Sequence, residues 1–134
     1  MDFHLTLAID FDGTICSNKS PDIGEPIMPA IETLKRLRHD LKCRLVLWTC
    51  REGLFLEKAV QFCHENGLFF DAVNTNVHAS EFFGHPKILA DFYIDDRTPG
   101  WFRMGNQERW HMIEEEIRER AKFNFKNMIK EITP

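Results

Sequence analysis

The sequence has no long apolar run: none of its 134 residues lies in a stretch approaching the roughly 20 apolar residues of a membrane-spanning helix. A basic segment followed by an apolar one is also missing, because Asp2 and His4 precede the first apolar run, so no signal peptide is expected. Basic residues number 17 against 21 acidic ones, and the net charge of -4 disfavours a nucleic-acid scaffold. We therefore expect no membrane association and no nucleic-acid scaffold, whereas a nucleotide stays open as a small substrate.

The cysteines lack the CxxC spacing of a zinc ribbon, so a structural zinc site is not expected. The four are Cys16, Cys43, Cys50 and Cys63. Cys43 and Cys63 fall in apolar periodic segments, which is typical of buried thiols. Because free thiols persist in a reducing compartment, the sequence favours a cytoplasmic location.

Apolar runs of strand length alternate with segments of helical periodicity along the whole chain. We expect strands at residues 5–9, 45–48, 69–73 and 92–94, and helices at 27–41, at about 56–65 and at 106–132. This alternation predicts an α/β fold in one domain, residues 1–134. The expected form is a Rossmann-like three-layer sandwich, with a mainly parallel sheet and helices on both faces.

Two carboxylates stand where the first predicted strand ends. Residues i and i+2 of a strand point to the same side, so Asp10 and Asp12 can reach one point, and Gly13 lets the chain turn away. Two adjacent carboxylates repel each other unless a cation or a shared proton lies between them. The pair therefore predicts a site of chemistry.

More polar residues lie at the predicted strand ends. Thr49 follows the second strand, Asp95 and Asp96 follow the last one, and Lys87 precedes it. Ligands of open α/β sheets bind beyond the carboxyl ends of the strands, so these side chains are expected to converge. Hard oxygen ligands without a His or Cys cluster favour Mg²⁺, which proteins commonly hold together with phosphate oxygens. The predicted cofactor is Mg²⁺ and the predicted partner is a phosphorylated substrate.

The pentapeptide at residues 10–14, Asp-Phe-Asp-Gly-Thr, resembles the DxDGT signature of the haloacid dehalogenase (HAD) superfamily of phosphohydrolases. Thr49, Lys87 and the pair Asp95-Asp96 match the second, third and fourth motifs of that superfamily, in order, within residues 5–97. The resemblance implies a phosphatase that works through an aspartyl-phosphate.

The resemblance also implies a role for each matching residue. Asp10 would be the nucleophile and a Mg²⁺ ligand. Asp12 would be the general acid and base, with its backbone carbonyl on the metal. Thr49 and Lys87 would hold the phosphoryl group. Asp95 would bind Mg²⁺ directly, and Asp96 would act through water or by orienting Lys87.

Three further residues are expected near the substrate: Gly13, Thr14 and Arg51. Arg51 has two readings, as a ligand for a second anionic group or as a salt-bridge partner. For Lys87 the alternative is a solvated loop lysine. Specificity is expected in residues 15–26 and 74–86.

The chain resembles capless members of the superfamily, because neither residues 13–27 nor residues 52–86 can hold a second core. Capless members act on large substrates or borrow a cover from a neighbouring subunit. The helix at 106–132 is longer than a small domain needs, so it either packs on the core or forms a homodimer seam. A phosphoaccepting switch, a phosphotransferase and an inactive binding domain are the alternative functions.

Overall fold

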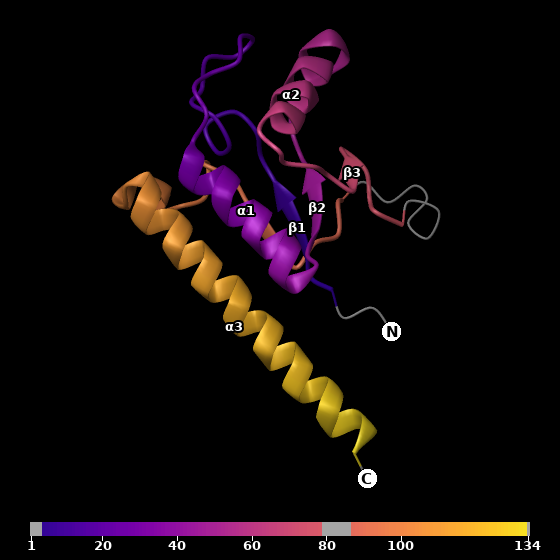
Figure 1. Ribbon diagram of the computed structural model, residues 1–134. Helices are drawn as coiled ribbons and strands as arrows, with labels where there is room; N and C mark the ends of the chain where they lie inside the picture. The colour runs from indigo at the N-terminus through magenta and orange to yellow at the C-terminus, as the bar shows by residue number, and fades with distance from the viewer. Residues whose placement is uncertain (1–3, 79–86, 134) are drawn as a thin grey trace.

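The computed structural model describes residues 4–78 and 87–133. It has an α/β fold built on a four-stranded parallel sheet in the order β3-β2-β1-β4 (Figure 1). The strands are β1 (Thr6–Ile9), β2 (Arg44–Leu47), β3 (Ala72–Val73) and β4 (Phe92–Ile94). The predicted alternation of strands and helices is confirmed. The third strand is shorter than predicted: the Asp71 carboxylate before it accepts a hydrogen bond from the Leu45 backbone N–H at 2.9 Å.

Three α-helices follow the predicted ranges. They are α1 (Met28–Leu41), α2 (Gly53–Glu65) and α3 (Asn106–Ile132), with a short 3-10 helix, η2 (Trp101–Arg103), before the last. Pro29 lies in the first turn of α1, where its missing N–H costs no hydrogen bond. Gly67, with φ of +75°, ends the turn after α2. Within residues 4–78 and 87–133, no helix combines the length and apolar character needed to cross a membrane.

The two faces of the sheet are covered differently. Leu7, Ile9, Leu45 and Leu47 face a buried cluster to which all three α-helices contribute apolar side chains. On the other face, Ala8 and Val46 pack with Ile88 and its neighbours in the crossover from β3 to β4.

The described residues of that crossover, 74–78 and 87–91, contain no helix. The prediction of helices on both faces is therefore not met in the described part of the chain. Polar residues interrupt these parts of the crossover, so no apolar helical stripe forms in them.

The strand register brings three chain segments to one edge of the sheet. Ile9 pairs with Leu47 on one side and with Ile94 on the other. The Asp10 N–H donates to the Ile94 carbonyl at 2.9 Å, and the Trp48 N–H donates to the Ile9 carbonyl at 2.8 Å. The residues after β1, β2 and β4 therefore leave the sheet side by side.

The first half of α3 packs against α1, whereas its second half extends beyond the body of the domain (Figure 1). Trp110 and Ile117 are buried in the shared core. The Glu114 carboxylate accepts hydrogen bonds from Arg36 of α1, the shorter at 2.9 Å. The contact with α1 confirms that the first half of the helix packs on the core.

Candidate active site

Three aspartates from the ends of β1 and β4 form an acidic cluster. Carboxylate oxygens of Asp10, Asp95 and Asp96, all half-buried, lie within 4.8 Å of one another. Buried Thr14 joins the two segments: its hydroxyl donates to Asp10 Oδ2 at 3.0 Å and accepts from the Asp96 N–H at 3.1 Å. The structure thus brings together three predicted metal ligands and places Thr14 behind them, as a residue that orients the cluster.

Gly13 is required by the close approach of Asp96. Its φ of +84° lies in the left-handed region that favours glycine, and a Cβ atom built on it would lie 2.3 Å from Asp96 Oδ2. A side chain at this position would displace the carboxylate. The predicted turn residue therefore also makes room for the acidic cluster.

Crowding changes the protonation of the cluster. Burial, a hydrogen bond with Asp96 and the negative charge of Asp95 together raise the pKa of Asp10 from 3.8 to about 7. A hard divalent cation would relieve this repulsion, and all three side chains offer carboxylate oxygens, the ligands that Mg²⁺ and Ca²⁺ prefer. The donor set therefore fits a divalent cation, held by Asp10, Asp95 and Asp96.

This protonation predicts a pH dependence of stability. Because the pKa of Asp10 is about 7 when folded and 3.8 as an ordinary carboxyl, the folded state holds an extra proton between those values. In a chelator, thermal unfolding scans should show a Tm that declines as the pH rises from about 4 to about 8. Added Mg²⁺ should restore the Tm above neutral pH, and Asp10→Asn should flatten the profile. If the Tm of Asp10→Asn varied with pH in the chelator in the same way as that of the wild type, the raised pKa of Asp10 would be contradicted.

Asp12 lies outside the cluster and is paired with Arg51. Arg51 Nε donates to Asp12 Oδ2 at 2.8 Å and Arg51 Nη2 donates to Asp12 Oδ1 at 2.7 Å. Only 4% of the Arg51 side chain and 17% of the Asp12 side chain are exposed. Of the two readings of Arg51, the structure therefore shows the salt-bridge partner.

The remaining donors of Arg51 hold backbone carbonyls. Its Nη1 donates to the carbonyls of Pro21 and Phe55, and its Nη2 donates to that of Asp22, at distances of 2.8 to 3.4 Å. These three hydrogen bonds and the two to Asp12 use all five N–H groups of the guanidinium. In this conformation, no donor of Arg51 is left for a substrate anion. The structure therefore shows Arg51 as a residue that positions Asp12 and does not show the predicted contact with substrate.

A cavity of about 500 Å³ opens in front of the cluster. Thr49 lies on its wall, where the Thr49 N–H donates to Asn74 Oδ1 at 2.8 Å. The wall also includes Asn18, Ser20, Trp48, Cys50 and Arg97. Arg97, like Arg51, was predicted to bind a second anionic group, whereas no site role was predicted for Trp48 and Cys50. Asn18 and Ser20 belong to the segment 15–26 predicted to set specificity, whereas part of the other such segment, 79–86, lies outside the described residues.

Lys87 is not among the residues that line this cavity. Its side chain is exposed, and Nζ lies 5.3 Å from the centroid of the Tyr93 ring. Tyr93 in turn contacts Trp48, with ring centroids 5.5 Å apart. Its predicted role in holding the phosphoryl group therefore stays a prediction.

Comparison with known proteins gives one informative match. No protein-family model and no curated protein matches the chain. A solved structure, described as a conserved protein coded by a locus from Bacteroides thetaiotaomicron, is 41% identical to it with a TM-score of 0.76. The similarity covers 87% of this chain and 92% of the other, so it includes nearly the whole of both.

Proposed function

We propose that this chain, which belongs to the same family as the conserved Bacteroides thetaiotaomicron protein, is a Mg²⁺-dependent phosphatase that hydrolyses phosphate monoesters. The observation that carries the proposal is the gathering of Asp10, Asp95 and Asp96 within 4.8 Å from two separate strand ends. The ordered motifs support membership of the HAD superfamily, as a small capless member.

The sheet supports the finer description of the fold as Rossmann-like. Its neighbouring strands are all parallel, and the order β3-β2-β1-β4 reverses direction beside β1, where Asp10 stands. Such a switch point is where open α/β sheets bind ligands. The third layer of the sandwich would be the crossover that includes Ile88. All four cysteines are free, which supports the proposed cytoplasmic location.

The chain's own residues account for two half-reactions. When bound by Asp10, Asp95 and Asp96, Mg²⁺ would supply positive charge beside the phosphoryl oxygens. The Asp10 carboxylate attacks phosphorus while the bond to the leaving oxygen breaks, and Asp12 gives that oxygen a proton. Water then attacks the phosphorus of the aspartyl-phosphate and passes a proton to Asp12. Inorganic phosphate leaves, and the Asp10 carboxylate is restored.

Positioning in this scheme comes from the hydrogen-bond partners. The Thr14 hydroxyl, 3.0 Å from Asp10 Oδ2, holds the orientation of the nucleophile. Arg51 holds the orientation of the Asp12 carboxylate through two hydrogen bonds. The cavity is open to solvent and lies beside Arg97, which supports a substrate larger than the cavity itself, with its bulk outside.

Metal removal tests the proposal. We expect the purified chain to release inorganic phosphate from at least one monoester among sugar phosphates, nucleotides, phosphopeptides and nucleic-acid termini. The release should stop in a chelator and return with excess Mg²⁺, because the acidic cluster binds phosphate only with a cation present. Hydrolysis that continues in the chelator would contradict the proposal. A stable phosphoprotein that releases no phosphate would favour the phosphoaccepting switch instead.

A further inference from the structure

The second half of α3 exposes apolar side chains. Phe123 and Phe125 are each 60% exposed, Ile129 is 40% exposed and Ile132 is 68% exposed. This part of the helix extends past the sheet and past α1 (Figure 1). Helical stability in proteins comes mostly from packing an apolar face, so such an end is expected to have a partner.

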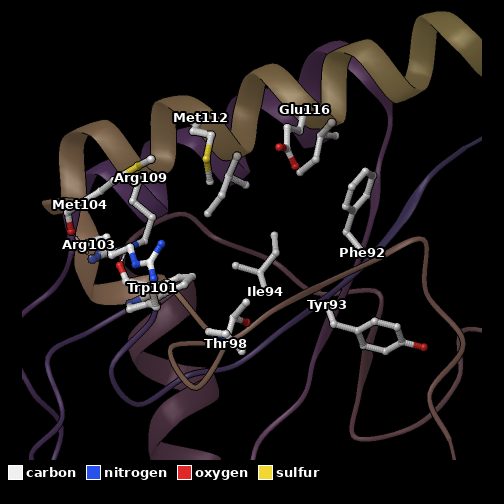
Figure 2. A pocket seen from close by; sticks show the side chains of 14 residues that line it. Phe92, Tyr93, Ile94, Thr98, Trp101, Arg103, Met104, Arg109, Met112 and Glu116 are labelled. Atoms are coloured by element: carbon white, nitrogen blue, oxygen red, sulfur yellow. Dashed lines mark hydrogen bonds between the residues drawn. The ribbon is translucent and has the colours of Figure 1, made fainter.

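The first half of α3 borders an apolar groove. A cavity of about 370 Å³ lies between α3 and β4, and Met112 of the helix projects toward it across from Ile94 and Phe92 (Figure 2). A second hollow continues the groove along the helix and shares Phe92 and Glu116 with it. Among the described strands, β4 pairs only with β1, so the groove runs beside a sheet edge.

The two halves of α3 carry opposite charge. Residues 106–117 contain four glutamates and one arginine, whereas residues 118–132 contain five basic and two acidic residues. Glu115, Glu116 and Glu119 line the hollow that continues the groove. Lys122, Lys126 and Lys130 lie on the projecting half, all exposed. Arginines also line the groove: Arg120 lies in the hollow, with Cζ 4.9 Å from the Phe92 ring centroid, and Arg103 and Arg109 lie in the first cavity, where Arg109 Nε donates to the Trp101 carbonyl. The acidic rim is therefore the stretch at Glu115, Glu116 and Glu119, and the projecting half is apolar with basic residues.

We propose that the projecting half of α3 from a second copy of this chain docks in this groove, so that the two α3 helices pack antiparallel about a two-fold axis. The exchange is reciprocal, because the same axis places each projecting half in the other groove. It covers both unpartnered apolar surfaces at once. An anionic membrane would attract the lysines but repel the acidic rim.

The sequence supplies a matching register. An axis between Arg120 and Ala121 brings Glu119 level with Lys122 of the partner subunit and Glu115 level with Lys126 of the partner subunit. The same axis brings Met112 level with Ile129 of the partner subunit. Opposite charges and apolar side chains therefore coincide along one antiparallel pairing. Thr98, in the loop after Asp95 and Asp96, and Trp101 of η2 also line the groove, so the docked second copy would lie near the candidate active site.

The oligomeric state of the full chain tests this docking. Sedimentation velocity of the wild type should give twice the chain mass of 15.8 kDa. Phe125→Asp combined with Ile129→Asp should give 15.8 kDa with an unchanged circular dichroism spectrum, because both side chains are exposed within one chain. Leu54→Asp, an equally exposed position on α2, should leave the mass doubled. A wild type that sediments as a single chain at its highest soluble concentration overturns the proposal.

A charge exchange tests the register without altering apolar residues. Glu115→Lys and Lys126→Glu should each raise the dimer Kd by roughly tenfold, since each change repeats across the two-fold axis. The double variant should return to the wild-type Kd, and Glu57→Lys on α2 should have no effect. A dimer that is insensitive to all these changes contradicts the antiparallel pairing. A monomer that sediments with phosphatidylserine vesicles assigns the helix to a lipid surface instead.

Discussion

Asp10→Asn is expected to reduce phosphate release by roughly 10³-fold or more while the chain stays folded, because the amide cannot form the acyl phosphate. The substitution keeps the size of the side chain and its contact with Thr14, which is 3.0 Å away. It also removes one charge from three crowded carboxylates, so the variant should unfold at or above the wild-type temperature in a chelator. Steady-state kinetics with Mg²⁺ and thermal unfolding measure the two effects.

Asp40→Asn serves as a matched control. Asp40 pairs with Arg118 on the surface, away from the acidic cluster, so this variant should keep wild-type turnover. An Asp10→Asn variant with more than a small fraction of wild-type activity would rule out Asp10 as the nucleophile. Loss of activity accompanied by unfolding would remove the support for the proposed role of Asp10.

Arg51→Ala is expected to have the largest effect on stability. It leaves the half-buried Asp12 carboxylate without its partner and frees the backbone carbonyls of Pro21, Asp22 and Phe55. Breaking a buried ion pair from one side costs about 3 kcal/mol of the free energy of unfolding. Turnover should fall by about 10²-fold as well, because Asp12 loses its orientation. Urea unfolding and the phosphate-release assay measure both losses.

Three further variants separate the pairing from general damage. Arg51→Lys should recover only part of the stability, since an ammonium cannot replace five planar N–H donors. Arg51→Ala and Asp12→Asn together should destabilise less than the sum of the single changes. Arg36→Ala, which removes a surface pair with Glu114, should cost no more than about 1 kcal/mol. If Arg51→Ala and Arg36→Ala reduced the free energy of unfolding by equal amounts, the buried pair of Arg51 and Asp12 would have no special role in stability.

Much of the fold follows from local patterns that the sequence displays. The last strand and the last helix were predicted with the bounds that the structure has, Phe92–Ile94 and Asn106–Ile132, because each is a continuous run of one periodicity. The gathering of Asp10 with Asp95 and Asp96 was also predictable, since parallel strands deliver their carboxyl ends to one edge.

Other features depend on contacts that leave no local pattern. Arg51 and Asp12 are 39 positions apart in the sequence, so no local pattern predicts their pairing. The five N–H donors of Arg51 could equally have bound a ligand. Trp48 and Cys50 looked like strand-end residues until the strand order placed them on the cavity wall. Lys87 lies beside Tyr93, and the described residues around it, 87–91, have no periodicity from which that contact could be predicted. Tertiary context decides each of these.

In the proposed mechanism, Asp10 carries the phosphoryl group during turnover. The enzyme is quenched during turnover, in the presence of Mg²⁺ and a monoester that it hydrolyses, and is then reduced with borohydride. The reduction converts an aspartyl-phosphate into homoserine, which peptide mass spectrometry can locate. We expect homoserine at residue 10 in the wild type and none in a sample quenched without substrate. Turnover with an unmodified residue 10, or with the phosphoryl group trapped at another side chain, would contradict the account.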